Sequence, residues 1–167
     1  FKKKIYLGDP INIVKIYSEL GVDEILINDI SDIDKPNFKL LKNISEESFV
    51  PLSYGGGVKN LTDIEKILSY GYEKILFNSL VFENYDFVEK AIKEFGSSSI
   101  SISVNLKFNF FKKLKLFNRK KKKFYNEGII DHLEKINQLD PCETLLTFVD
   151  FEGTKKGYPK ELIKDYF

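Results

Sequence analysis

Residues 21–30 read Gly-Val-Asp-Glu-Ile-Leu-Ile-Asn-Asp-Ile, and residues 71–80 repeat the pattern as Gly-Tyr-Glu-Lys-Ile-Leu-Phe-Asn-Ser-Leu. A weaker copy, Asp-Pro-Cys-Glu-Thr-Leu-Leu-Thr-Phe-Val, occupies residues 140–149. Each copy follows a helical pattern and contains a short apolar strand. A duplicated unit of alternating helices and strands favours a (β/α) barrel built by repetition over a doubly wound sheet.

The rest of the chain continues this alternation. The pattern predicts strands at residues 24–29, 49–54, 74–78, 99–106 and 144–149, helices at residues 10–20, 39–44, 61–70, 85–95 and 128–139, and a further helix from residue 159. Short strands that are apolar throughout are typical of a parallel sheet covered on both faces. Five strands cannot close an eight-stranded barrel. We therefore expect a TIM (β/α)8 barrel fragment that lacks the first strand and the last two strands, with residues 1–167 as one partial domain.

Composition limits the function classes. A net charge of +1 gives no global attraction to nucleic acid or to a membrane surface. No apolar run approaches the roughly 18 residues of a membrane-spanning helix. The single Cys142 cannot form an internal disulfide, which fits the cytoplasm, and with the single His132 it is poor material for a metal site. We expect no metal and no cofactor. The absence of Met and the start at Phe1 indicate a piece of a longer product.

The run Val-Pro-Leu-Ser-Tyr-Gly-Gly-Gly-Val-Lys-Asn, residues 50–60, joins a predicted strand to a predicted helix through three glycines. Glycine lets the backbone approach a ligand closely, and free N–H groups ahead of a helix attract anions. The run therefore predicts a phosphate site at Gly56 and Gly57, although loops also use glycine for geometry alone.

Residues 108–125 are basic and interleaved with aromatic side chains. Such a segment could grip RNA or an acidic surface, but the low net charge favours a hairpin insertion with solvated lysines. A third interpretation is a mobile lid whose lysines attract an anionic substrate. His132 lies on a predicted helix, away from any strand end, and is interpreted as a structural or surface residue.

Six groups of residues together resemble one family. These are residues 8–10, 22–26 and 54–57, the pair 78–79 with 83–84, the pair of segments 95–97 and 104–107, and residues 146–158. In this order and spacing the chain is similar to the cyclase subunit of imidazole glycerol phosphate synthase, a TIM barrel of histidine biosynthesis. Within that family it most resembles the paralogues found in surface-glycan gene clusters.

The resemblance implies two phosphate sites. One uses the end of the triple glycine, here Gly57, with Asn78 and Ser79; the serine keeps the hydroxyl of the family's threonine. The other uses an Asp-Gly-Thr turn, which in this chain reads Glu-Gly-Thr and comprises Glu152, Gly153 and Thr154.

The resemblance also implies the chemistry. A glutaminase partner releases ammonia, which passes through the barrel and attacks a ribulosyl phosphate substrate, while two strand-end aspartates act as acid and base. The first aspartate lies on the strand that this chain lacks, and the second position is Asn105. Asparagine cannot exchange a proton near pH 7, and losing an acid or base typically costs about 10²–10⁴-fold in rate. We therefore expect inefficient formation of imidazole glycerol phosphate, with Asn105 orienting the substrate or ammonia.

The family's ring of charged residues that gates ammonia matches Glu24, Lys74 and Glu143. Taken alone, these residues would be read as exposed charges at strand starts. At the other end of the strands, Asp29 and Lys107 are candidate catalytic residues, with Thr147 and Asp150 as further residues of the mouth.

The resulting hypothesis is the synthase (lyase-type) subunit of a glutamine amidotransferase pair. It would use channelled ammonia on a phosphorylated ribulosyl-type substrate, or amidate a surface-glycan sugar as a paralogue. The alternative is a catalytically inactive barrel that binds and regulates a glutaminase.

Overall fold

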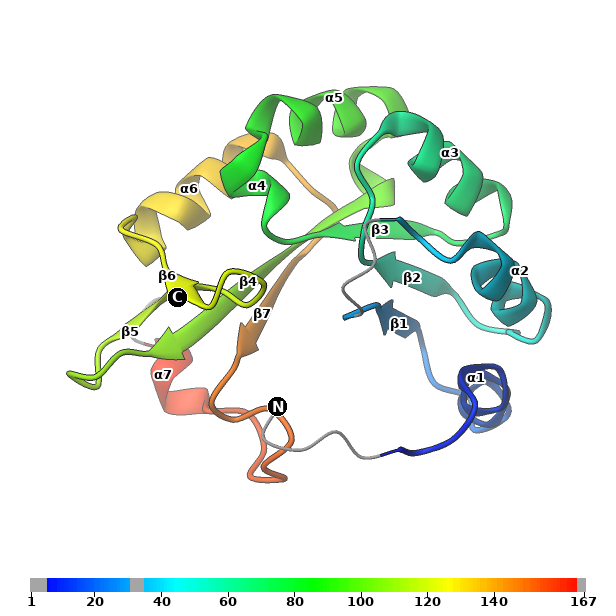
Figure 1. Ribbon diagram of the computed structural model, residues 1–167, viewed down its shortest axis with the longest axis horizontal. Helices are drawn as coiled ribbons and strands as arrows, with labels where there is room; N and C mark the ends of the chain where they lie inside the picture. The colour runs from blue at the N-terminus through cyan, green and yellow to red at the C-terminus, as the bar shows by residue number, and fades with distance from the viewer. Residues whose placement is uncertain (1–5, 31–34, 165–167) are drawn as a thin grey trace.

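The computed structural model describes residues 6–30 and 35–164. Within them, five strands pair in parallel in the order of the chain: β1 (Ile25–Asn28), β2 (Leu52–Gly55), β3 (Lys74–Phe77), β4 (Ile100–Phe108) and β7 (Thr144–Phe148). The sheet curves into an arc, and its end strands β1 and β7 do not pair with each other in the described part of the chain (Figure 1). The predicted barrel topology is confirmed, and the sheet stays open.

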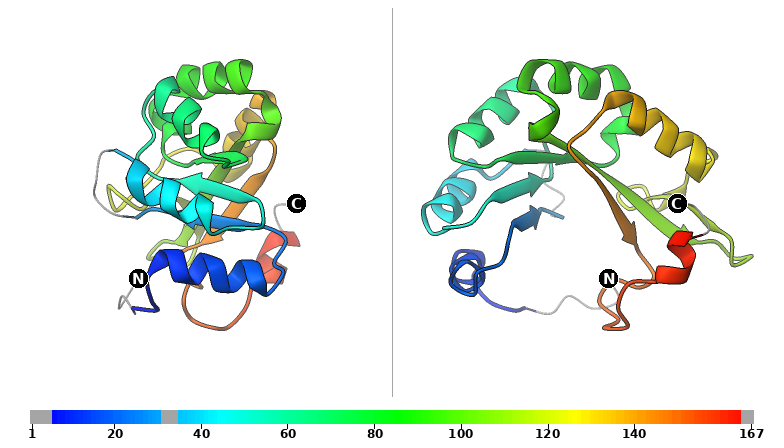
Figure 2. Two further views of the ribbon diagram at one scale, coloured as in Figure 1. Left: turned by 90° about the vertical axis from the view of Figure 1, so that its right-hand side faces the viewer. Right: turned by 180° about the vertical axis from the view of Figure 1, so that it is seen from behind.

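Helices line the convex side of the arc, as the views from the side and from behind also show (Figure 2). They are α1 (Pro10–Glu19), α2 (Phe38–Glu46), α3 (Leu61–Ser69), α4 (Leu80–Glu83), α5 (Tyr85–Phe95) and α6 (Ile129–Leu139), with a 3-10 turn at Ser97–Ser99. Side chains of Asp9, Asn37, Asn60 and Asn84 accept backbone N–H groups at four helix starts. These caps fix where each helix begins, because they satisfy donors that a helix leaves unpaired.

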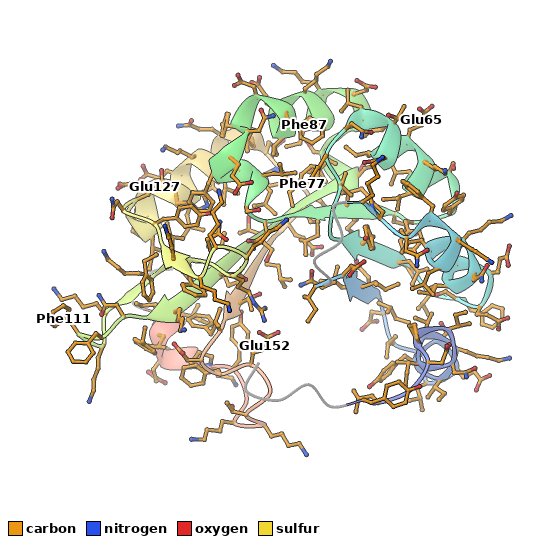
Figure 3. The ribbon with its side chains drawn as sticks, in the orientation of Figure 1. Glu65, Phe77, Phe87, Phe111, Glu127 and Glu152 are labelled. Carbon is orange, nitrogen blue, oxygen red and sulfur yellow. The ribbon has the colours of Figure 1, made fainter. Side chains whose placement is uncertain are left out.

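The two faces of the sheet differ in polarity. Alternate residues of a strand share a face, so the register separates an apolar outer set from a mixed inner set, in which serines and asparagines alternate with Leu26, Leu76 and Leu145. The outer set packs against the helices; the Phe77 and Phe87 rings, 5.8 Å apart, join β3 to α5 (Figure 3). Along the inner set, Ser53, Ser101 and Ser103 are buried.

The basic insertion is a β-hairpin. Strand β4 runs two residues beyond its predicted end and pairs in antiparallel fashion with β5 (Leu114–Asn118), which pairs with β6 (Lys123–Phe124). Leu106 pairs with β5 on one edge and with β7 on the other. Strand β5 therefore pairs with the same edge of β4 as β3 does, but nearer to the carboxyl end of β4. Figure 3 shows Phe111 at the projecting tip.

Two helix predictions need adjustment. The short α4 was missed, because four residues between two turns carry no measurable periodicity. The predicted helix from residue 159 is α7 (Lys160–Lys164), and its expected continuation through residues 165–166 lies outside the described residues.

Candidate functional site

A hollow of about 450 Å³ opens where β1 to β4 end. Its walls are residues 28–30, 55–59, 76–80 and 118–120, together with Glu83, Ser103, Asn105 and Lys122. Six residues singled out in the sequence meet here: Asp29, Gly56, Gly57, Asn78, Ser79 and Asn105. The carboxyl ends of barrel strands carry the active sites of TIM-barrel enzymes, so this hollow is the candidate site.

The glycine turn forms one wall and needs its glycines. A Cβ atom on Gly56 would lie 2.7 Å from the Cβ of Asp29 and 2.8 Å from its carbonyl oxygen. Gly57 adopts a φ of 62°, in the left-handed region that disfavours side chains. The turn is therefore pressed against the end of β1, which keeps its backbone at the edge of the hollow.

Asp29 also contacts the base of this wall. The Tyr54 hydroxyl donates a long hydrogen bond of 3.4 Å to the Asp29 carboxylate. Burial and the neighbouring Asp29 charge both raise the pKa of Tyr54, so the phenol stays protonated and remains a donor. Asp29 thus lines the hollow as an acceptor held by the sheet.

The opposite wall is the turn after β3. Asn78 donates from Nδ2 to the Ser103 carbonyl oxygen at 2.9 Å and to its hydroxyl at 3.1 Å. Asn105 donates from Nδ2 to the Asn78 Oδ1 at 3.1 Å. Ser79 makes no capping bond with its side chain. The Ser79 hydroxyl is therefore not committed to the helix that follows it.

The basic hairpin supplies residues that the sequence reasoning did not assign to the site: Asn118, Arg119, Lys120 and Lys122 all line the hollow. Asn118 is buried; it donates to the Tyr125 hydroxyl at 2.7 Å and accepts the Lys121 backbone N–H at 2.8 Å. The signal available in sequence was position: a hairpin inserted after β4 must emerge at the carboxyl end of the sheet.

Ion pairs tie this hairpin to both sides of the mouth. Lys121 contacts Glu83 of α4 at 2.6 Å, and the hydrogen bond that Lys121 donates to this carboxylate raises the pKa of Lys121. Arg119 contacts Glu152, in the turn after β7, at 2.9 Å. The hairpin therefore bridges the turns that follow β3 and β7.

The residues predicted for a second phosphate site lie outside the hollow. Glu152 is paired with Arg119, and the Thr154 hydroxyl donates to the Phe151 carbonyl oxygen at 2.7 Å. Gly153 adopts a φ of 71°, as a tight turn requires. The turn of residues 152–154 is present, but it does not line the hollow together with Gly57, Asn78 and Ser79.

Three other predicted residues of the mouth also lie outside the hollow. The Lys107 ammonium rests 4.6 Å from the centre of the Phe117 ring, which is a cation–π contact with the hairpin. Asp150 accepts the Phe108 backbone N–H at 2.8 Å. Thr147 pairs with Asn105 across β7 and β4. Lys107 and Asp150 thus make contacts that hold the base of the hairpin.

The opposite end of the sheet carries a charge cluster. Lys74 lies 2.6 Å from Glu24 and 3.2 Å from Glu143, and its side chain is only 16% exposed. Ser101 donates to Glu143 at 3.2 Å, and Ser53 donates to Glu24. The three charges are therefore paired in the structure, in contrast to the interpretation of separate solvated charges.

This pairing shifts the pKa values of Lys74 and Glu24. The hydrogen bond to Glu24 raises the pKa of Lys74, although burial alone would lower it. Burial would raise the pKa of Glu24, but the hydrogen bonds from Lys74 and Ser53 outweigh it and hold that pKa below its ordinary value. Both residues are charged at neutral pH.

His132 is buried within α6, which decides between the two interpretations, structural or surface. Its ring stacks on Phe82 at 3.9 Å, and Phe82 stacks on Tyr125 at 3.6 Å. Its Nδ1 lies 3.0 Å from Glu127, and burial lowers the pKa of the imidazole. The stack fastens α4, and so the turn after β3, to α6.

In residues 6–30 and 35–164, no helix is long and apolar enough to cross a membrane. The same residues contain no group of three or more His, Cys, Asp or Glu side chains that could hold a metal ion.

An open arc of parallel strands, with helices on its convex side and a hollow at the strand ends, defines a β/α-barrel class of protein. The family model described as histidine biosynthesis protein matches residues 1–167. The chain belongs to this family.

Curated relatives agree. The chain is 38% identical over 176 residues to the "Putative imidazole glycerol phosphate synthase subunit hisF2" of Campylobacter jejuni, with 98% of this chain and 66% of that protein covered. It is 34% identical over 173 residues to the "Putative imidazole glycerol phosphate synthase subunit HisF" of Leptospira borgpetersenii, with 98% and 66% covered. It is 34% identical over 167 residues to the imidazole glycerol phosphate synthase subunit HisF of Helicobacter hepaticus, with 94% and 64% covered. The chain thus spans about two thirds of the length of these relatives.

Proposed function

We propose that this chain is the phosphate-binding, ammonia-using part of a synthase subunit in a glutamine amidotransferase pair. The substrate is a phosphorylated ribulosyl-type compound or, in a glycan paralogue, a sugar that is amidated. The observation that carries the proposal is the combination of a hollow walled by the glycine turn at one end of the sheet with an ion-paired charge cluster at the other.

The hollow fits a phosphate group. The glycine turn brings backbone close to the cavity, and Ser79 offers a hydroxyl that no helix cap uses. The cationic hairpin lines the same space and supplies positive charge for an anion. Phosphate held here would fix the rest of the substrate above the inner face of the sheet.

The charge cluster fits a gate for ammonia. Glu24, Lys74 and Glu143 occupy the starts of β1, β3 and β7, at the end of the sheet away from the hollow. Buried serines of the inner face lie between the cluster and Asn105. A small neutral molecule that can form hydrogen bonds suits this face, where the serines are interspersed with Leu26, Leu76 and Leu145, whereas an ion would have to compete with the paired charges.

Asn105 favours the second candidate, an inactive barrel that regulates a glutaminase, because a carboxamide cannot act as acid or base. The hollow argues against it, since a barrel that only docks has no use for a phosphate pocket. Phosphate binding therefore separates the two candidates.

The test uses the intact protein together with a glutaminase partner. Inorganic phosphate is titrated by calorimetry, and turnover of the phosphorylated ribulosyl substrate is followed with ammonium salt and with glutamine. Saturable phosphate binding with ammonia-dependent turnover supports the synthase. Glutaminase stimulation without phosphate binding would instead establish the regulatory barrel.

A further inference from the structure

The orientation of one carboxamide in the hollow is fixed by the backbone. Strand β3 ends at Phe77, so β4 continues past it and the Ser103 carbonyl has no strand partner from β3. Asn78 fills that place, with its Nδ2 2.9 Å from the Ser103 carbonyl oxygen. A carbonyl can only accept a hydrogen bond. The nitrogen of Asn78 must therefore face Ser103, and its oxygen must face away.

That oxygen faces residue 105. The distance from Asn105 Nδ2 to Asn78 Oδ1 is 3.1 Å, and Asn105 is only 8% exposed. Because Asn78 Oδ1 can only accept, this contact is a hydrogen bond that Asn105 donates. An ionised carboxylate at position 105 could not make the same bond, because it has no hydrogen to donate.

We infer that Asn105 is a positioning residue: its carboxamide donates to Asn78 and thereby holds the turn of Asn78 and Ser79 in its anion-binding form. This inference rests on the proposed phosphate site. It gives position 105 a hydrogen-bonding role in place of proton exchange. The Ser103 carbonyl orients Asn78, and Asn105 donates to the oxygen that this orientation turns toward it.

Two substitutions at this position separate the possible roles. Asn105→Asp has a similar shape and lacks the donor when ionised. Asn105→Leu has a similar size and neither donor nor charge. Inorganic phosphate is titrated into the intact parent and both variants at several pH values, and each affinity is expressed relative to the parent at the same pH. This ratio cancels the titration of phosphate itself.

We expect both variants to bind phosphate about tenfold more weakly near pH 7, the typical effect of losing one buried hydrogen bond. Asn105→Asp should recover as the pH falls below its carboxyl pKa, because the protonated acid can donate to Asn78. Asn105→Leu should not recover at any pH. A loss confined to Asn105→Asp would overturn the inference, since it would mean simple repulsion of phosphate. Parent-like binding by both variants would overturn it as well.

A measurement on the unmodified protein tests the hydrogen bond directly. It remains decisive if the variants fail to fold or if the parent does not bind phosphate. In the parent, NMR should show slower solvent exchange for the bonded side-chain amide hydrogens of Asn78 and Asn105 than for an exposed asparagine, because both groups donate hydrogen bonds within the protein. Fast exchange like that of an exposed asparagine would refute the hydrogen bond between the carboxamides of Asn105 and Asn78. Absence of phosphate binding with slow exchange would refute the phosphate site and leave the donor role of Asn105 standing.

Discussion

Replacing Lys74 by methionine removes the cation from between two carboxylates while keeping a side chain of similar length. Glu24 and Glu143 lie 2.6 Å and 3.2 Å from the Lys74 ammonium. After the substitution, Glu24 keeps the burial that disfavours its charge and loses the hydrogen bond that offsets it. The variant is therefore expected to be less stable than the parent at neutral pH.

The magnitude follows from the exposure of the three side chains. Stripping one partner from a fully buried ion pair costs about 3–5 kcal/mol, whereas exposed pairs contribute about 1 kcal/mol or less. Lys74 is 16% exposed, and its partners are 30% and 52% exposed, so the cluster lies between these limits. We expect Lys74→Met to lower the free energy of unfolding by about 2 kcal/mol.

Urea unfolding at two pH values checks the cause as well as the size. The pKa of Glu24 is lower in the folded parent than in the unfolded chain, so its contribution to stability is present above the unfolded value and is lost as the pH falls through the folded value. In Lys74→Met that pKa rises. The difference in stability between parent and variant should be complete near pH 7 and shrink below about pH 4.

An exposed pair provides the matched control. Lys93 contacts Glu89 at 2.9 Å on α5, with 69% of the lysine side chain exposed. Lys93→Met should change the free energy of unfolding by less than about 0.5 kcal/mol at either pH. Equal losses for the two substitutions, or a Lys74→Met deficit that does not depend on pH, would refute the reasoning from partial burial.

Three further predictions address the walls of the site. Gly56→Ala should lower stability by about 2–3 kcal/mol because its Cβ would meet Asp29, whereas Gly71→Ala, with a φ of 95° and open space, should lose about 1 kcal/mol; similar losses in thermal unfolding would contradict the contact. Because burial lowers the pKa of His132, acidification from about pH 7.5 to about pH 5.5 should destabilise the parent more than His132→Gln in urea titrations; parallel pH profiles would exclude this. Ser79→Ala should weaken inorganic phosphate about tenfold by calorimetry, and unchanged affinity would remove the hydroxyl from the site.

The strand order was predictable from sequence because it depends on local patterns repeated along the chain. Glycine or a polar cap marks most helix ends, and apolar runs such as residues 25–28 and 74–77 locate the strands. The hairpin was predicted as one of three interpretations of residues 108–125. Its pairing along the β3 edge of β4 depends on the extension of β4 to Phe108, two residues beyond the predicted end of that strand.

Some residues of the candidate site were likewise predictable from the sequence, and others were not. The glycine turn and Asn78 with Ser79 follow strand ends directly, so the fold alone brings them together. Lys107 was expected in the mouth but contacts Phe117, because the hairpin offers it an aromatic face. The insertion point after β4 places the hairpin at the carboxyl end of the sheet, but the strand pairing and the contact of Arg119 with Glu152, which bring Asn118 and Arg119 to the hollow, are tertiary features.

The charge cluster depends on a difference between the three copies of the repeat. Glu24, Lys74 and Glu143 hold the same place, the fourth residue, in the three copies that begin at residues 21, 71 and 140. Identical copies would have set like charges at one level of the curved sheet, where they repel. Reversal of sign in the middle copy turns that repulsion into two ion pairs. Lys74→Glu would make the three copies alike at this place, and it would replace two ion pairs by three neighbouring carboxylates that hold the strand starts apart.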